Sequence, residues 1–336
     1  MDAASQPTVS VVIPSRDGAT PRDGLTYLEM VLGTLSRQGF RDFDVTVVDN
    51  GSTDGSVEYL RERWPEVRVV ELPENSGFST AINRGLAASG GRYVALLNND
   101  VELSPDWLEL LVAELERDPR VGFVTGKIMR HDDRDVIEQA GQDFFTCGHF
   151  EPRGLDQRDA GQYDERGRTT IVTAAAALYR REALARAGNF DEDYFLYCED
   201  GDACLRILLS GYSGLYVPEP RAFHVRGGTI GAQSELPRFY LVRNALITLL
   251  KDLPAPLLVR SLAKIALYQY GQLVASRKQG VARTVLRAYG SFLRMLPATL
   301  RKRRAVQGAR RVRTAEFATQ VRTDYPLPTR LGRFIR

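Results

Sequence analysis

The sequence predicts an α/β protein with a mostly parallel central sheet. Its first 130 residues contain short runs that are almost entirely apolar, which is typical of strands buried on both faces. Between these runs lie stretches with apolar residues at helical spacing, such as Leu28, Val31, Leu32 and Leu35. Strands that alternate with helices form parallel sheets with right-handed crossovers, and this alternation is the basis of the prediction.

The predicted elements follow one another with short polar connections. The strands are expected at residues 9–13, 43–48, 67–72, 93–97 and 121–125, and the helices at residues 25–38, 56–64, 78–86 and 106–117. The outline is that of a nucleotide-binding domain. Residues 150–168, rich in Gly, Arg and Asp, are expected to form a mobile loop.

Charge is divided unevenly along the 336 residues. The net charge is +3, but residues 251–336 carry +16 and residues 1–250 carry −13. A basic tail on an acidic body indicates an anionic partner for the tail, and a membrane surface and a nucleic acid are both candidates. The tail has no aromatic residues interleaved with its cations in the manner of nucleic-acid-binding segments, so we expect no nucleic acid as partner.

The N-terminus and the cysteines indicate the compartment. Met1 to Pro7 has neither a basic region nor an apolar core, so a signal peptide is not expected. Cys147, Cys198 and Cys204 are odd in number and form no C-x-x-C pair, which argues against a disulfide framework. We expect a cytoplasmic protein.

Two predicted strands end in carboxylates, Asp49 and Asp100. In open α/β sheets ligands bind beyond the carboxyl ends of the strands. One carboxylate can accept the imide N–H of a uracil or thymine, and the other can hold a metal ion that bridges a diphosphate. The chain has no G-x-G-x-x-G after its first strand and no P-loop. The alternative is that both residues simply form polar turns, as Asp and Asn often do.

Four ordered blocks carry a family resemblance. They read V-S-V-V-I-P-S-R-D-G, V-V-D-N-G-S-T-D-G-S, E-N-S-G-F-S-T-A-I-N-R-G-L and L-L-N-N-D-V, in that order over some 90 residues. In this combination they resemble the N-terminal half of family 2 glycosyltransferases, and the rhamnosyltransferase-type members in particular. The resemblance implies the GT-A fold, a Rossmann-like nucleotide-diphospho-sugar transferase domain.

The resemblance also implies roles for individual residues. Asp100 corresponds to the metal-binding end of a D-x-D-like motif, with Mn²⁺ or Mg²⁺ as the expected cofactor, although Asn98 stands where many members have the first Asp. The residues expected to bind the donor are Pro14, Ser15, Arg16, Asp49, Gly77, Asn83, Asn98, Asn99, Asp100 and Arg226.

A second group of candidate catalytic residues follows an aromatic segment, Tyr194 to Tyr197. Glu199, Asp200 and Asp202 place three carboxylates within four positions at the start of a predicted helix, where one or two would be explained by helix capping and the helix dipole. The resemblance continues here in E-D-G-D-x-x-x-R and implies that Asp200 is the catalytic base. Glu199, Asp202 and Arg206 are expected on the acceptor side.

His224 precedes a glycine-rich loop in A-F-H-V-R-G-G-T. A single histidine after a strand is often a structural residue. The resemblance, however, implies that His224 is a second metal ligand, which would offset the missing carboxylate at Asn98. Arg226 and the adjacent glycines would then close over the diphosphate.

The C-terminal region, residues 251–336, is expected to be a basic helical extension of a catalytic domain that spans residues 1–250. Within that domain, residues 1–125 would bind the nucleotide sugar and residues 126–250 the acceptor. Two amphipathic helices at 257–274 and 281–296, followed by Arg301 to Arg304, suit an anionic membrane surface. They could equally pack on the catalytic domain or on a second subunit of a homo-oligomer.

These observations predict an inverting, hexosyltransferase-type enzyme that uses a nucleotide-diphosphate sugar. A dTDP-rhamnose-like donor is favoured by Asn98-Asn99-Asp100, with UDP-galactofuranose and UDP-N-acetylhexosamine as alternatives. The expected acceptor is a lipid-linked or growing bacterial glycan of the cell wall, at the inner face of the membrane. A catalytically inactive nucleotide-sugar-binding scaffold is the alternative of another class.

Overall fold

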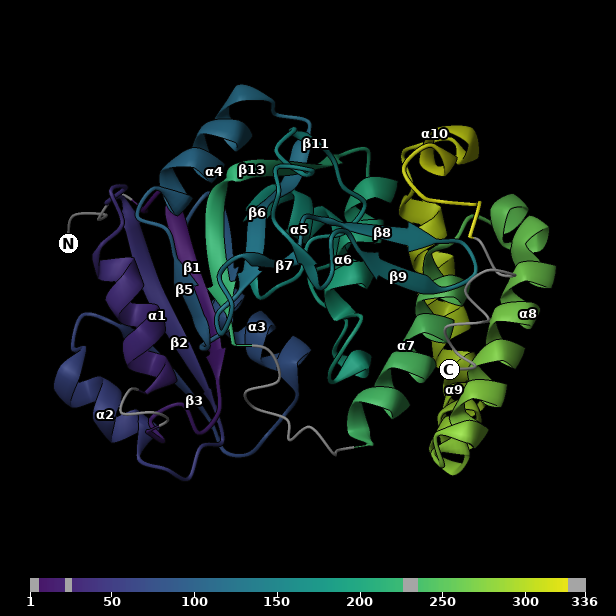
Figure 1. Ribbon diagram of the computed structural model, residues 1–336, viewed down its shortest axis with the longest axis horizontal. Helices are drawn as coiled ribbons and strands as arrows, with labels where there is room; N and C mark the ends of the chain where they lie inside the picture. Colours follow the sequence, from purple (N-terminus) through teal and green to yellow (C-terminus); the bar gives the residue numbers. More distant parts are fainter. Residues whose placement is uncertain (1–5, 22–25, 226–234, 326–336) are drawn as a thin grey trace.

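The computed structural model describes residues 6–21, 26–225 and 235–325. A mixed sheet crosses the molecule, with its strands in the order β10-β7-β6-β12-β4-β1-β2-β3, and β5, β11 and β13 joined to it at one side. Helices cover both faces of the sheet, and a group of helices from the C-terminal region stands at one end (Figure 1).

The parallel half of the sheet confirms the predicted alternation. Strands β1, β2, β3 and β4 are all parallel to their neighbours. The elements of this half are β1 (Val9–Ser15), α1 (Tyr27–Ser36), β2 (Phe43–Asn50), α2 (Ser56–Arg63), β3 (Arg68–Leu72), α3 (Phe78–Ala87) and β4 (Tyr93–Leu97). Strand β2 is two residues longer than predicted, because Asp49 and Asn50 still pair with β3.

The second half of the sheet is mixed in direction. Strand β12 runs antiparallel to both β4 and β6, and it therefore joins the parallel core to the rest of the sheet. The elements of this half are β5 (Val101–Leu103), α4 (Trp107–Arg117), β6 (Val121–Arg130), β7 (Val136–Gln139), β8 (Gln142–Phe145), β9 (His149–Pro152), β10 (Gln157–Arg158), β11 (Gly167–Arg168), β12 (Ala176–Arg180), α5 (Arg181–Ala187), the 3-10 helix η1 (Glu192–Tyr194), α6 (Glu199–Leu209) and β13 (Ser213–His224).

Residues 150–168 are mostly turns and irregular backbone, as expected of a loop, but short strands tie the segment to the sheet. Parts of β9, β10 and β11 lie in this range, and β10 and β11 pair with β7 and β13. Buried Lys127 also anchors it, because its ammonium group contacts the carboxylates of Asp159 and Asp164. The polar composition that indicated a loop therefore supplies partners for a buried cation.

Both faces of the parallel core are buried, as the apolar runs predicted. Alternate residues of β1 enter different hydrophobic clusters. Val11 and Ile13 pack with Leu28 of α1, whereas Val12 packs with Ile82 of α3. A strand with helices on both sides has no face for polar side chains, which is why its sequence shows no alternation.

In the described part of the chain, four helices follow the sheet: α7 (Leu236–Asp252), α8 (Ala255–Lys278), α9 (Ala282–Ala309) and α10 (Thr314–Ala318). Helix α9 is longer than predicted and runs through Pro297 and the basic cluster Arg301 to Arg304. Side chains of Arg303 and Gln307 donate to the last carbonyl groups of α7, at Leu250, Leu253, Lys251 and Asp252. Helices α7 and α9 are therefore packed together. Among the described residues, no helix is long and apolar enough to cross a membrane.

We predict that Gly126→Ala destabilises the sheet between β6 and β13. A Cβ atom at Gly126 would lie 1.9 Å from the carbonyl oxygen of Pro220, so the backbone would have to move. The expected loss is about 1–3 kcal/mol in the free energy of unfolding, as for other overpacked sites, measured by urea denaturation. Gly167→Ala in β11 is the matched control, because a Cβ atom there has no heavy atom within 4 Å. Equal stability of the two variants would contradict the prediction.

Candidate functional site

The carboxyl ends of β1, β2 and β4 meet at one edge of the sheet. Ser15 pairs with Asp49 across β1 and β2. Asn99 follows β4 and donates from Nδ2 to the Ser15 hydroxyl at 3.0 Å. Side chains thus join the ends of β1 and β4, strand pairing joins β1 and β2, and the polar residues predicted from separate motifs lie at one edge.

Asp49 lies in this edge with only 3% of its surface exposed. Its Oδ2 accepts the backbone N–H of Ser52 at 3.1 Å. Its Oδ1 is buried and has no hydrogen-bond partner among the described residues. An unsatisfied buried carboxylate oxygen is costly, and the N–H group of a ligand would satisfy it.

The neighbours of Asp49 divide into buried and exposed residues. Pro14 lies in β1 opposite Val48 and is buried. Arg16 lies just after the strand with 46% of its side chain exposed, and its Nε is 3.7 Å from Asp17. The exposed guanidinium of Arg16 therefore provides positive charge at the rim of the site.

Asp100 lies in a cluster with His224, Glu138 and Asn98. His224 Nε2 is 3.2 Å from Asp100 Oδ1 and 3.3 Å from Asn98 Nδ2, and His224 Nδ1 is 2.9 Å from Glu138 Oε1. The strand pairing that makes this cluster is between β13 and β5, where His224 is opposite Val101. The structure therefore brings together Asp100 and His224, which are 124 residues apart in the sequence.

The cluster holds more negative charge than one imidazole balances. Burial by itself lowers the pKa of His224, but hydrogen bonds and charge from Asp100 and Glu138 outweigh it and raise the pKa to about 10. The two carboxylates therefore favour the protonated ring, and a cation bound between them would replace this proton, because a metal ion binds the neutral imidazole.

The donor types in this cluster suit a divalent cation. Glu138 Oε2 is buried and has no hydrogen-bond partner among the described residues, and carboxylate oxygen with imidazole nitrogen is a ligand set that Mn²⁺ accepts. In the part of the chain that the structure describes, no three His, Cys, Asp or Glu side chains are arranged as a complete set of metal ligands. Arg226, expected to close this end of the site, lies outside the described residues.

Asp200 lies at the start of α6 and connects to the same edge of the sheet. Its Oδ1 accepts the N–H of Gly201 at 2.7 Å, and its Oδ2 accepts the N–H of Ala174 at 3.4 Å. The adjacent Ala175 accepts the N–H of Asn98 through its carbonyl at 3.0 Å. Asp200 and the Asn98–Asp100 segment therefore flank one short stretch of backbone, residues 174–175.

Burial raises the pKa of the Asp200 carboxyl group, although hydrogen bonds from the backbone and from Thr173 offset part of this shift. The neighbouring Glu199 is 5% exposed, and burial together with the charge of Asp200 raises its pKa well above the usual value. Of these two adjacent carboxyl groups, Glu199 holds its proton more firmly, which leaves Asp200 as the one that is available to accept a proton.

Asp202 and Arg206 belong to α6, but their charged groups are used inside the protein. Asp202 is fully buried, and it contacts Arg206 through Oδ2 and Lys251 Nζ through Oδ1 at 2.5 Å. The expectation that these two residues face the acceptor is therefore corrected, because their polar atoms already have partners. They support the helix that carries Asp200.

Gly77 and Asn83 both contact the segment that precedes α6. Gly77 has φ of +88°, and a Cβ atom there would lie 2.7 Å from the ring of Phe195. Asn83 binds the segment that precedes α6, because it donates to Phe190 O and Glu192 Oε1 and accepts from Phe190 N–H. With its amide occupied in this way, Asn83 joins the donor half to the acceptor half and does not face the donor.

The segment before α6 is strained. Phe195, Tyr197 and Cys198 all have positive φ, which is rare for residues with side chains. Two buried residues of α7 hold the segment. Asn244 Nδ2 contacts the carbonyl oxygens of Tyr194, Leu196 and Tyr197, and Arg243 donates to Asp193 O and Tyr194 O. Phe195 stacks on Tyr240 of the same helix, with ring centroids 5.4 Å apart.

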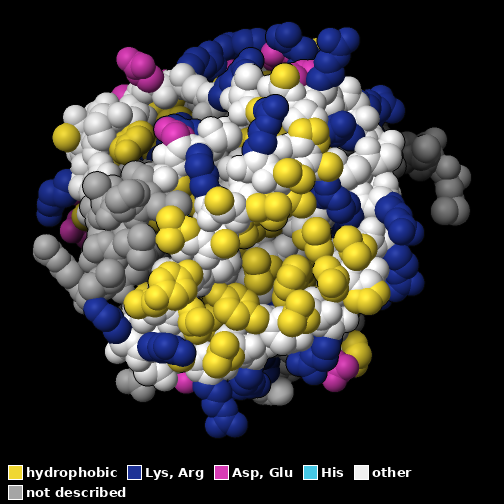
Figure 2. Space-filling model, turned by 90° about the vertical axis from the view of Figure 1, so that its right-hand side faces the viewer, with side chains coloured by type: hydrophobic (Ala, Val, Ile, Leu, Met, Phe, Trp, Pro, Cys, Tyr) yellow, Lys and Arg dark blue, Asp and Glu magenta, His cyan; other side chains and the backbone are white. Residues whose placement is uncertain are grey.

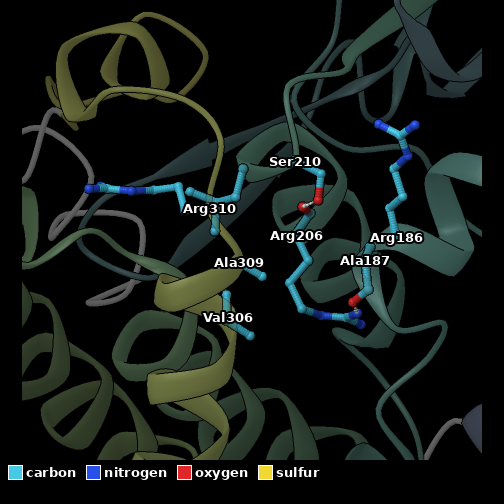
Figure 3. A pocket seen from close by; sticks show the side chains of 8 residues that line it. Arg186, Ala187, Arg206, Ser210, Val306, Ala309 and Arg310 are labelled. Carbon is cyan, nitrogen blue, oxygen red and sulfur yellow. Dashed lines mark hydrogen bonds between the residues drawn. The ribbon is translucent and has the colours of Figure 1, made fainter.

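A small hollow of about 20 Å³ lies behind α6, lined by residues of α5, α6 and α9. Figure 3 shows Arg206 turned toward the carbonyl oxygen of Ala187, to which it donates, while Arg186 and Arg310 point away. The hollow has room for about one water molecule, so it is not a nucleotide-sugar site.

Sequence reasoning missed several residues on which the site depends. Glu138 lies in V-I-E-Q, where no motif marks it. Arg243, Asn244 and Lys251 did leave a signal, because they are polar residues inside an otherwise apolar helical run, and such residues are retained in a buried helix only when they have partners.

Residues 10–188 match the model of glycosyl transferase family 2, which is more than half of the chain. A relative in Mycobacterium tuberculosis, an N-acetylglucosaminyl-diphospho-decaprenol L-rhamnosyltransferase, is 30% identical over 228 residues, covering 61% of this chain and 74% of that one. A pre-mycofactocin glycosyltransferase of the same species is 31% identical over 212 residues, covering 62% of this chain and 41% of the relative.

Solved structures share the fold. A mannosyltransferase of Pyrobaculum calidifontis, in complex with GDP-Man and Mn²⁺, superposes with a TM-score of 0.53 at 19% identity, over 94% of this chain and 87% of that one. GalNAc-T7, with UDP, GalNAc and Mn²⁺, superposes with a TM-score of 0.56 at 16% identity, over 73% and 48%. These neighbours confirm the predicted GT-A fold.

We predict that Lys251→Met strongly destabilises the protein. Lys251 is 1% exposed and its ammonium group contacts both Asp191 and Asp202 at 2.5 Å, so its removal takes a positive charge from two buried carboxylates and leaves them only Lys302 and Arg206. The expected loss is about 3–5 kcal/mol in the free energy of unfolding, measured by chemical denaturation near neutral pH. Lys264→Met, which removes a charge from the exposed surface, should cost less than about 1 kcal/mol. A loss as small for Lys251→Met would contradict the ionic role.

Proposed function

Because the chain belongs to glycosyl transferase family 2, we propose that it transfers a sugar from a nucleotide-diphosphate donor to a hydroxyl group of a lipid-linked or growing glycan, with inversion at the anomeric carbon. The observation that carries the proposal is the placement of Asp100 and Asp200. The Asp200 side chain accepts the N–H of Ala174, and Asn98, two residues before Asp100, donates its N–H to the carbonyl oxygen of Ala175. A sugar between Asp100 and Asp200 would have its diphosphate on one side and its acceptor on the other.

The nucleoside would lie at the ends of β1 and β2. The unsatisfied Oδ1 of Asp49 suits the imide N–H of uracil or thymine, and Pro14, Ser15 and Arg16 would line the same pocket. We favour a dTDP-rhamnose-like donor, which the 30% identity to a rhamnosyltransferase supports. UDP-galactofuranose and UDP-N-acetylhexosamine are the alternatives.

Asp100 and His224 would hold a divalent cation, Mn²⁺ or Mg²⁺, beside the diphosphate. Such a cation stabilises the charge that develops on a leaving diphosphate. Glu138 would orient His224 through its Nδ1, and this is how carboxylates commonly fix the ring of a metal-binding histidine. Asn98 and Asn99 would hold the loop that carries Asp100 against Ser15 and His224.

Asp200 would act as the general base. It would accept the proton of the acceptor hydroxyl as that oxygen attacks the sugar from the face opposite the nucleotide. The pKa of Asp200 is raised by burial, which makes its carboxylate a stronger base than an exposed one, and Glu199 beside it would remain protonated.

The acceptor would reach the site from a membrane surface if it is attached to a lipid. The name of the Mycobacterium tuberculosis relative describes a lipid diphosphate acceptor, and the same class is proposed here at the inner face of the cell membrane. A non-catalytic scaffold that binds a nucleotide sugar is the alternative, and the inward-facing, base-like Asp200 argues against it.

We expect dTDP or UDP species to raise the melting temperature in the presence of Mn²⁺ or Mg²⁺, because a ligand that binds only the native state stabilises it by mass action. Thermal unfolding against a panel of nucleotides and nucleotide sugars, with metal or with EDTA, is the measurement. NAD and ATP are the controls and should give no shift. A shift with these controls, or none with any pyrimidine nucleotide, would contradict the donor assignment.

We expect Asp200→Asn to lower the rate of sugar transfer by about 100-fold or more, the usual contribution of a general base, while donor binding stays intact. The rate of the unsubstituted enzyme should rise with pH as Asp200 loses its proton, and the midpoint should lie above that of an ordinary Asp because its pKa is raised. Transfer kinetics over a pH series measure both effects. An Asp200→Asn variant that binds donor and keeps its full rate would move the role to Glu199.

A further inference from the structure

The C-terminal helices present an unusual apolar face. Nine large hydrophobic side chains are exposed among the described residues, and all nine lie on α7, α8 or α9. The most exposed are Val259 at 65%, Tyr270 at 64% and Leu293 at 62%. Figure 2, which views this end of the molecule, shows the hydrophobic side chains gathered into one broad area. Contiguous exposed apolar surface of this kind is rare on soluble proteins and marks an interaction site.

The exposed residues form stripes along the helices. On α9, Leu286, Leu293 and Leu300 are spaced seven residues apart, which places them on one side of the helix. On α8, Val259, Leu262, Leu267 and Tyr270 also fall on one side. Helices α8 and α9 pack against each other at the end of the molecule that Figure 2 faces.

All the charged residues of α8 and α9 are basic. Residues 253–315 contain 14 Lys and Arg and no Asp or Glu. Exposed cations lie on the same two helices, among them Arg260 of α8 and Arg283 and Arg287 of α9, and these three form no ion pair with other described residues. Figure 2 shows Lys and Arg side chains around the hydrophobic area.

Only part of the basic charge serves the fold. Lys302 binds Asp191 and Asp193, and Arg303 donates to the end of α7, so these two cations point into the protein. Within the part of the chain that the structure describes, the exposed Arg260, Arg283 and Arg287 have no such partner.

We infer that this face of α7, α8 and α9 docks on the surface of an anionic lipid bilayer. The apolar side chains would enter the boundary between headgroups and acyl chains, and the arginines around them would contact anionic headgroups. A second copy of the chain is a poorer occupant, because a symmetric contact would oppose two basic surfaces. The inference rests on the proposed function only in that a lipid-linked acceptor would be delivered from this side.

The test is flotation of the full chain with vesicles. We expect binding to phosphatidylcholine vesicles that contain about one third phosphatidylglycerol, weak binding to phosphatidylcholine alone, and loss of binding at high salt. Leu262→Ser/Leu293→Ser removes apolar surface at two exposed sites, and Arg260→Glu/Arg287→Glu reverses two charges. Each variant should bind at least about tenfold more weakly, since each buried apolar side chain and each cation contributes to binding.

Arg63→Glu/Arg68→Glu is the matched control, because both arginines are exposed on α2 and β3 at the other end of the molecule. This control should bind as the unsubstituted chain does. Binding that is equal for all three variants, or absent from anionic vesicles, would overturn the inference. A dimer in solution that the Leu262→Ser/Leu293→Ser variant loses, without vesicle binding, would also overturn it in favour of a second copy. Transfer to a water-soluble acceptor should be unchanged throughout, which separates this inference from the proposed function.

Discussion

The ion pairs of Lys251 hold together parts of the molecule that are far apart in the sequence. From α7, Lys251 reaches Asp202 on α6 and Asp191 before η1, and Lys302 of α9 meets the same Asp191. Burial by itself raises the pKa of the Asp191 carboxyl, but the charge of Lys251 and the hydrogen bonds from Lys251 and Lys302 together lower it, so the carboxylate form is the one stabilised here. Buried charges tolerate loss of a partner poorly, and the position of α6 therefore depends on the C-terminal helices.

The C-terminal helices therefore help to position the residues of the candidate site. Helix α6 carries Asp200, and the strained segment before it is held by Arg243 and Asn244 of α7. Positive φ at three residues is stable only where the surroundings determine the backbone. The half of the site proposed to bind the acceptor is thus assembled between the sheet and α7, whereas the half proposed to bind the donor is built from strand ends alone.

The charge asymmetry of the chain has two physical origins in the structure. Some cations of the basic tail, such as Lys251 and Lys302, neutralise carboxylates of the acidic body. Others, on α8 and α9, face outward beside apolar side chains. The cations of the tail therefore bind the acidic body on one side of the C-terminal helices and leave the other side strongly basic.

The sequence by itself determined the parallel core and the residues at the ends of its strands. Apolar runs such as Tyr93–Leu97 are recognisable because both of their faces are buried, and the polar residues that follow them necessarily lie at one edge. Only the tertiary structure decided which polar residues face the site. Asn83 and Asp202 look like site residues in the sequence, yet their partners, at Phe190 and Lys251, lie many residues away. Glu138 joins His224 through pairing of distant strands, which no local pattern encodes.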